Sequence, residues 1–289
     1  MGLLDRLCAI TALATCLIGA IEGETLGSVL AAHQVPVAGL SDAERQQAIT
    51  SFAVSGGGSA FLLAYYDYDG STALPPLLHV FRFDRTNGRS KRADLRGQEV
   101  PPDQVMDKLP GVCLGSALRI SEENGLIAID THINPSAGCV LLLSADLELK
   151  AVLPGTLSRR LGNRLIVAGN SIHFAPTHPG TLGVFDPARK QLTPIYPAAG
   201  DQRRIAFSKR LQAHLPSPAW CRESNNACDP ENFTTDIFNV KVDVPRSAFS
   251  FDAAMRPQGF GKDAEAAIPS QTVHYEYTFR NGTWTLTSK

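Results

Sequence analysis

The sequence has little charge, few tryptophans and no long apolar run after its first twenty residues. Charged residues make up 19% of the 289, and the formal net charge is -1. A nucleic-acid-binding surface, which needs a basic excess to displace counterions, is therefore not expected. No segment after residue 20 has 18 consecutive apolar residues, so no membrane span is expected once that segment is removed.

Several catalytic and metal-binding motifs are also missing. There is no GxSxG nucleophile elbow, no HExxH zinc helix and no CxxC pair. The glycine-rich GGGS at 56–59 precedes an expected strand instead of a helix, which does not fit a phosphate loop. A serine hydrolase, a zinc protease and a thiol oxidoreductase are therefore not supported.

The N-terminus reads as an export signal. Residues 7–20, LCAITALATCLIGA, form an uncharged apolar run that is too short to span a bilayer comfortably. We expect residues 1–20 to be a signal peptide cleaved after Ala20, which predicts an exported protein, periplasmic or extracellular. The alternative is a buried N-terminal helix.

Cysteine usage agrees with export. Cleavage would leave four cysteines, and an even number in an oxidising compartment indicates two disulfides with three possible pairings. We favour the pairs Cys113–Cys139 and Cys221–Cys228.

Most of the remaining chain predicts short strands. Asn-Gly pairs at 87–88, 124–125 and 281–282 are typical of type I′ hairpin turns, because both turn residues need a positive φ. Ser41, with Glu44 three residues later, forms a capping box that predicts a helix near 42–48. A second helix is expected at 203–215, and 21–40 reads as a linker.

The expected strands group in fours. The four units comprise 49–55, 60–67, 77–84 and 89–95; 116–121, 126–132, 139–145 and 148–153; 157–161, 164–168, 180–185 and 190–195; and 237–243, 247–253, 271–279 and 283–287. In the first three units, the third strand is apolar and is followed by an Asp-containing turn and then by a polar strand. This repetition favours a small β-propeller of four to five blades, and a β-sandwich is the alternative.

The expected domain organisation follows from this grouping. Residues 21–48 would be a linker with a short helix, and 49–289 a single propeller-like domain with an insertion at 203–236. Three stretches, STALPPLLHVFRFD, DTHINPSAGCVLLLS and CDPENF, resemble exported β-rich proteins of acidobacterial genomes. That resemblance implies a bacterial exported β fold and no assigned activity.

The stretch YYDYDGS at 65–71 could bind calcium through Asp67 and Asp69. A calcium loop needs six or more oxygens, and Pro76 occupies the position where an acidic residue would close the site. Asp-Gly between two apolar strands is ordinary turn chemistry. We therefore expect a turn and no cofactor, with calcium as the alternative.

Two further polar segments could contact a ligand. Four carboxylates in or beside the loop that the second disulfide would close are candidates for binding: Glu223, Asp229, Glu231 and Asp236. The basic run at 82–96 could meet an anionic polymer, although a charged outer strand needs no partner. His132 beside Asp130, and His173 with His178, lack a strong metal-ligand spacing.

These observations favour a non-enzymatic domain that binds a protein, peptide or glycan through its loops. The alternative is a glycan hydrolase of the propeller type, which needs two carboxylates at a fixed separation. Asp130, Glu122 and Glu123 are candidates, but nothing in the sequence singles them out. Two tryptophans are also few for a sugar groove, although tyrosine could substitute.

Overall fold

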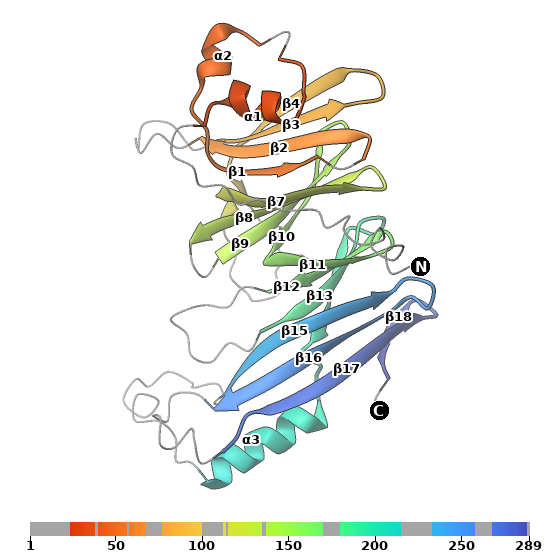
Figure 1. Cartoon of the computed structure of the whole chain (residues 1–289). Helices are drawn as coiled ribbons and strands as arrows, with labels where there is room; N and C mark the ends of the chain where they lie inside the picture. The colour runs from red at the N-terminus through yellow and green to blue at the C-terminus, as the bar shows by residue number, and fades with distance from the viewer. Residues whose placement is uncertain are drawn as a thin grey trace, which may run out of the picture. The chain divides into compact units, whose positions relative to one another are not determined.

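The computed structural model describes residues 24–37, 40–56, 58–67, 77–99, 112–113, 115–134, 137–169, 180–214, 233–257 and 268–287. Strands dominate these ranges, and they form four four-stranded antiparallel sheets (Figure 1). The predicted all-β chain of propeller-like, four-stranded meanders is confirmed. Each sheet holds four consecutive strands in chain order, which differs from the Greek-key connections of a sandwich.

The observed strands match the predicted ones closely. The first sheet contains β1 (Thr50–Ser55), β2 (Ala60–Asp67), β3 (Leu77–Asp84) and β4 (Arg89–Leu95). The second contains β7 (Ser116–Glu123), β8 (Leu126–Asn134), β9 (Ala137–Ser144) and β10 (Leu149–Pro154). The third contains β11 (Thr156–Leu161), β12 (Arg164–Ala168), β13 (Leu182–Asp186) and β14 (Gln191–Tyr196). The fourth contains β15 (Phe233–Asp243), β16 (Ala248–Pro257), β17 (Gln271–Arg280) and β18 (Thr283–Leu286). A two-stranded ladder joins β5 (Gln98–Glu99) to β6 (Val112–Cys113).

Two of the three Asn-Gly pairs form the predicted turns. Asn124 and Gly125, like Asn281 and Gly282, both have positive φ values between 50° and 82°. The prediction was wrong for the pair at 87–88, where only Gly88 has a positive φ, of 69°. There the Asp84 carboxylate accepts a hydrogen bond from the Thr86 N–H at 2.8 Å, which favours a four-residue loop over a two-residue turn.

Three helices accompany the sheets. The predicted capping box begins α2 (Asp42–Gln46), and α3 (Gln202–His214) matches the second predicted helix. The linker interpretation of 21–40 was wrong, because α1 (Leu26–Ala32) buries Leu26, Val29 and Leu30 on one face. These three apolar residues, at spacings of three and four, form one stripe of a helix. A Cβ at Gly27 would lie 2.9 Å from the Arg45 carbonyl oxygen, so a glycine lets α1 approach α2 closely.

The chain divides into two compact units. Unit 1 comprises 1–96, 116–129 and 144–148, and unit 2 comprises 97–115, 130–143 and 149–289. In unit 1, the helices α1 and α2 lie beside the first sheet, and the α1 stripe packs against apolar side chains of that sheet, including Phe61 and Leu63. Unit 2 has a larger core, rich in aromatic side chains, that joins α3 to the third and fourth sheets. The single-domain expectation for 49–289 stays a prediction. In the described ranges, we find no helix with the length and apolarity of a membrane span.

Candidate functional site

A groove of about 700 Å³ lies in unit 2, at the β13–β14 and β17–β18 hairpins. Its volume is in the range of pockets that bind small organic ligands. Six of the residues that line it define its chemistry: Arg164, Asp186, Arg189, Gln191, Phe279 and Trp284. We call this the aromatic groove.

The aromatic wall of the groove comes from one hairpin. Phe279 on β17 pairs directly across the ladder with Trp284 on β18, and their ring centroids are 5.0 Å apart. The positive φ values of Asn281 and Gly282 close this hairpin tightly, which places both rings on the same face of the sheet. The Trp284 ring also makes an edge-to-face contact with the Phe249 ring, with 5.2 Å between the ring centroids. The indole is only partly buried, so part of its surface faces the groove.

The polar wall is anchored by an arginine and a carboxylate. Arg164 on β12 places its guanidinium 4.0 Å from the centroid of the Phe279 ring, a cation–π contact. Its Nε also lies 3.4 Å from Oδ2 of Asp186, at the end of β13. The other carboxylate oxygen of Asp186 accepts hydrogen bonds from the backbone N–H groups of Ala188 and Arg189. Arg164 therefore connects the aromatic wall to the polar wall.

The remaining polar groups of the groove face solvent. Arg189 and Gln191 are exposed. Within the part of the chain that the structure describes, the guanidinium of Arg189 makes no hydrogen bond or ion pair. The groove therefore offers both donors and acceptors, and, among the residues that the structure describes, Arg189 has no counter-ion.

Among the described residues that line the groove, Asp186 is the only carboxylate. A retaining or inverting glycosidase needs two carboxyl groups on opposite sides of the scissile bond. Asp186 is also engaged by Arg164 and by two backbone N–H groups. Among its described residues, the groove has groups that can stack against a ligand and hydrogen-bond to it, together with this one carboxylate.

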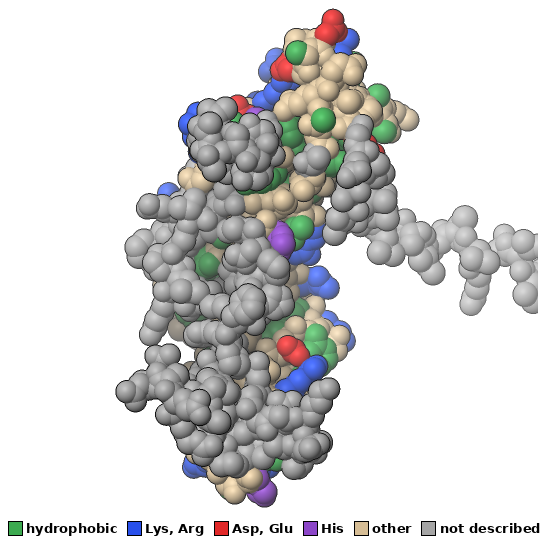
Figure 2. All heavy atoms as spheres, turned by 90° about the vertical axis from the view of Figure 1, so that its left-hand side faces the viewer, with side chains coloured by type: hydrophobic (Ala, Val, Ile, Leu, Met, Phe, Trp, Pro, Cys, Tyr) green, Lys and Arg blue, Asp and Glu red, His purple; other side chains and the backbone are tan. Residues whose placement is uncertain are grey.

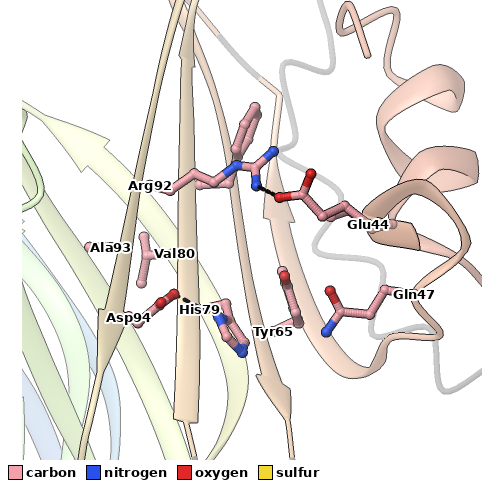
Figure 3. A pocket seen from close by; sticks show the side chains of 10 residues that line it. Glu44, Gln47, Tyr65, His79, Val80, Arg92, Ala93 and Asp94 are labelled. Carbon is pink, nitrogen blue, oxygen red and sulfur yellow. Dashed lines mark hydrogen bonds and ion pairs between the residues drawn. The ribbon is translucent and has the colours of Figure 1, made fainter. Parts of the chain in front are cut away.

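A second, smaller pocket of about 260 Å³ lies in unit 1, between α2 and the first sheet (Figure 3). Here His79 on β3 and Asp94 on β4 are cross-strand partners, and the His79 Nδ1 lies 2.7 Å from the Asp94 carboxylate. The imidazole stacks on Tyr65 with a centroid distance of 4.8 Å, so His79 packs against its neighbours in the sheet. Arg92 pairs with Glu44 at the same pocket. Its charged groups thus engage one another, so we regard it as the weaker ligand site.

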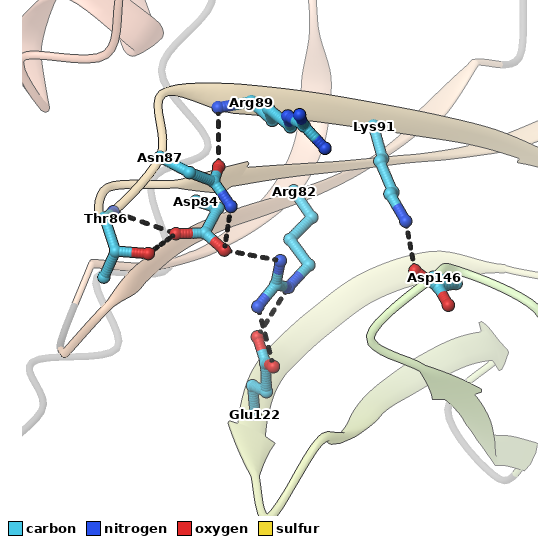
Figure 4. A network of polar contacts seen from close by, with 8 residues as sticks. All are labelled: Arg82, Asp84, Thr86, Asn87, Arg89, Lys91, Glu122 and Asp146. Carbon is cyan, nitrogen blue, oxygen red and sulfur yellow. Dashed lines mark hydrogen bonds and ion pairs between the residues drawn. The ribbon is translucent and has the colours of Figure 1, made fainter.

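The basic run at 82–96 is partly neutralised by carboxylates in the structure (Figure 4). Arg82 forms two hydrogen bonds with Glu122, at 2.9 and 3.1 Å, and Lys91 pairs with Asp146. On the face shown in Figure 2, cationic, acidic and apolar side chains of the described residues are interspersed. A partner of the anionic-polymer class therefore gains no support from this strand.

The three proposed hydrolase acids do not converge on the aromatic groove. Glu122 lies in unit 1 and is bound by Arg82. Asp130 is buried, and its carboxylate accepts a hydrogen bond from the Leu157 N–H at 2.8 Å. None of Glu122, Glu123 and Asp130 lines the groove. Within the described ranges, no group of three or more His, Cys, Asp or Glu residues could hold a metal ion.

Most of the predicted site residues lie outside the described side chains. Asp67 ends β2, and neither its side chain nor Asp69 is described, so the calcium alternative stays a prediction. The same holds for Glu223, Asp229 and Glu231 of the predicted binding loop. Asp236 is described: it lies exposed on β15 and pairs with Arg256 at 3.0 Å. The predicted insertion at 203–236 therefore ends earlier, because β15 begins at Phe233.

The cysteine pairings are also only partly visible. Cys139 is buried on β9 and is disulfide-bonded. The side chain of Cys113, and the whole of Cys221 and Cys228, lie outside the described residues. Both predicted pairings therefore stay predictions.

Sequence reasoning missed the aromatic groove. Its residues come from three separate stretches of the chain, namely Arg164, 184–199 and 277–284. In the sequence, Trp284 belongs to an apolar hairpin face and Asp186 to a repeated turn, and neither pattern by itself indicates a ligand site. A usable signal is the end of that hairpin, where a tryptophan follows an Asn-Gly turn after one intervening residue, Thr283.

Comparisons with known proteins give weak structural likenesses only. No protein-family model matches the sequence, and no curated protein matches it. The propeller domain of the trilobed protease from Pyrococcus furiosus is 10% identical over 80% of this chain and 54% of its own, with a TM-score of 0.36. A GH43 β-1,3-galactosidase solved with galactodeoxynojirimycin is 11% identical over 87% of this chain and 79% of its own, with a TM-score of 0.29. Cobalt-substituted apocarotenoid oxygenase from Synechocystis is 12% identical over 87% of this chain and 53% of its own, with a TM-score of 0.31. The chain spans about half the length of the first of these structures, and we draw no functional argument from them.

Proposed function

We propose that this chain is an exported, non-enzymatic binding protein that holds a saccharide in the aromatic groove. The observation that carries the proposal is the pairing of a partly exposed Trp284 with a polar wall that contains one carboxylate. That wall supports binding, whereas hydrolysis would need a second acid. Export is part of the proposal and rests on the apolar run at 7–20.

The chemistry of the groove suits a sugar. A pyranose ring has an apolar face of C–H groups and a rim of hydroxyls, each of which both donates and accepts. The indole of Trp284 offers an apolar surface that loses little conformational entropy on binding. Arg164 and Asp186 lie on the polar wall, where the arginine donates only and the carboxylate accepts only. Gln191 supplies both functions in one amide group.

The groove is also pre-organised. Arg164 is stacked on Phe279 and paired with Asp186, while Asp186 is fixed by two backbone hydrogen bonds. Side chains that are already ordered cost less conformational entropy when a ligand binds. This lower entropy cost matters most for a weakly bound ligand such as a sugar.

Tryptophan fluorescence offers a direct test because the chain has only Trp220 and Trp284. In a Trp220→Phe background, Trp284 is the sole indole. We expect its emission to shift on titration with at least one member of a panel of neutral and acidic tetrasaccharides, and the dissociation constant to rise at least about tenfold in Gln191→Ala. In the Trp220→Phe background, Trp284→Ala should abolish the signal. In otherwise unaltered protein, calorimetry should show that Trp284→Ala weakens binding.

Two results would overturn the proposal. One is a panel in which no saccharide changes the emission of Trp284 or gives a calorimetric signal. The other is binding that persists at full affinity in both Trp284→Ala and Gln191→Ala. Release of new reducing ends during incubation would favour the hydrolase alternative.

A further inference from the structure

The charges in the aromatic groove do not balance. Two arginines, Arg164 and Arg189, and one carboxylate, Asp186, line it, which leaves a formal excess of one positive charge. Arg164 and Asp186 compensate each other, with 3.4 Å between Nε and Oδ2. The excess therefore resides on Arg189, whose guanidinium has no hydrogen-bond or ion-pair partner within the described residues.

The backbone fixes where the Arg189 side chain begins. Arg189 lies in the four-residue loop between β13 and β14, and its N–H donates to the Asp186 carboxylate at 3.3 Å. The next residue, Lys190, has a φ of 52°, a left-handed conformation that turns the chain into β14. The same carboxylate that pairs with Arg164 thus positions Arg189 at the groove. The backbone of Arg189 is thereby held in place, and its side chain is left to move.

We propose that the groove selects an anionic saccharide, and specifically a uronate whose carboxylate pairs with Arg189. This inference rests on the proposed function and refines its ligand class. A guanidinium presents its N–H groups in a planar fork that matches the two oxygens of a carboxylate. The sugar ring that carries this carboxylate stacks on Trp284, while its hydroxyls meet Asp186 and Gln191.

A neutral sugar would leave the Arg189 charge unused, and a free anion would leave the aromatic wall unused. The combination of a stacking surface with one unpaired cation is what favours a sugar that carries its own charge. Because Arg189 is exposed, the ion pair should weaken as salt rises. The preference for the charged ligand is therefore expected to depend on ionic strength.

The test compares matched ligands by isothermal titration calorimetry on the full chain. The probes are tetra-uronates of galacturonic, glucuronic and mannuronic acid, each paired with its carboxyl-reduced, neutral counterpart. At low salt, we expect at least one uronate to bind about tenfold or more tightly than its neutral counterpart. The ratio should fall below about threefold in 0.5 M salt, where the Debye length is only a few ångströms.

Variants assign the preference to Arg189. Arg189→Ala should reduce the ratio to below about threefold, and most of this fall should come from lost affinity for the uronate. Arg189→Lys should retain an intermediate ratio, because a lysine keeps the charge but not the planar fork. Arg89→Ala is the matched control, since Arg89 is another exposed arginine but lies on β4 in unit 1. It should leave the ratio unchanged.

The possible failures are distinguishable. Equal affinity for a uronate and its neutral counterpart would overturn the charge selection and leave the saccharide function intact. Equal loss of both affinities in Arg189→Ala would show that Arg189 does not act through the ligand charge. A further probe is the neutral tetrasaccharide with one sulfate ester added, which carries a negative charge but no carboxylate. If it binds as tightly as the uronate, the proposed pairing of Arg189 with a carboxylate is contradicted. Absence of binding by every probe would remove the proposed function as well.

Discussion

Two of the four sheets have helices packed on one face, and the two attachments differ. The first sheet carries α1, which attaches through its apolar stripe. It also carries α2, which has no buried residue and contributes Glu44 to an ion pair with Arg92 at the edge. The fourth sheet carries α3, which buries Phe207 and Leu211 together with Arg204. The first attachment has apolar buried contacts and an ion pair at its exposed edge, whereas the second includes the buried cation Arg204.

Arg204 contributes to the attachment of α3 by stacking its guanidinium on aromatic rings, whereas the buried contacts of α1 are apolar. Its guanidinium lies 4.9 Å from the centroid of the Phe233 ring and 5.1 Å from that of Tyr196. Its Nη1 also donates to the Tyr196 hydroxyl at 2.8 Å and to Thr235 Oγ1 at 3.2 Å. A helix can therefore attach to aromatic side chains of neighbouring strands through a planar cation.

The largest effect should come from truncating an apolar anchor of either attachment. Leu30 of α1 and Leu211 of α3 are both fully buried, so each change to alanine should cost about 3 kcal/mol of unfolding free energy. Hydrogen exchange should locate the damage: Leu30→Ala should speed exchange in β1–β4, and Leu211→Ala in β15–β18. A cost below about 1 kcal/mol would show that the helix concerned is dispensable.

The next largest effect should separate the two attachments. Arg204→Ala should cost about 2–3 kcal/mol, because it removes two hydrogen bonds and two ring contacts from a buried site. Arg204→Lys should recover little, since an ammonium lacks the planar stacking surface. Urea unfolding is the measurement, and Lys209→Ala on the exposed side of α3 is the control. Full stability of Arg204→Lys would contradict the stacking argument.

The smallest effect concerns the edge of the first attachment, and it is lost at acid pH. Hydrogen bonds from the Ser41 backbone and side chain, with a further one from Arg92, lower the pKa of Glu44 to about 2. An ionised Glu44 thus adds stability above its ordinary pKa of 4.5, and this stability is lost as pH falls from 4.5 toward 2.

Unfolding free energies measured between pH 6 and 2 should show a shallower acid-induced loss for Glu44→Gln than for the unaltered chain. Arg92→Ala should remove only part of the difference, because the Ser41 bonds are the larger causes. Curves for Glu44→Gln and the unaltered chain that run parallel down to pH 2 would show that Glu44 contributes no such stability.

Much of the fold could be predicted because its signals are local. Alternation of apolar and polar residues and two Asn-Gly turns located nearly every strand of the four sheets. The helix α1 was missed because a seven-residue segment carries only three periodic apolar positions, too few to separate it from a linker. The loop at 85–88 was misread because the Asp84 carboxylate, a side-chain effect, overrode the preference of Asn-Gly.

The aromatic groove could not be predicted for a different reason. Its walls come from β12, the β13–β14 hairpin and the β17–β18 hairpin, and only tertiary packing brings Arg164 onto Phe279. A sequence pattern reports which face a residue occupies within its own element. It does not report which element will lie opposite that face.

The chain-order arrangement of the strands has a kinetic meaning. Every ladder in the four sheets joins strands that are neighbours along the chain, so each pairing closes a loop no longer than the segment between two consecutive strands. The loop-closure entropy of such pairings is small, and topologies rich in local contacts fold faster than those built from distant pairings. A sheet such as β11–β14 contains all of its own partners once residue 196 has been made. Its hydrogen-bonded ladders need no later part of the chain.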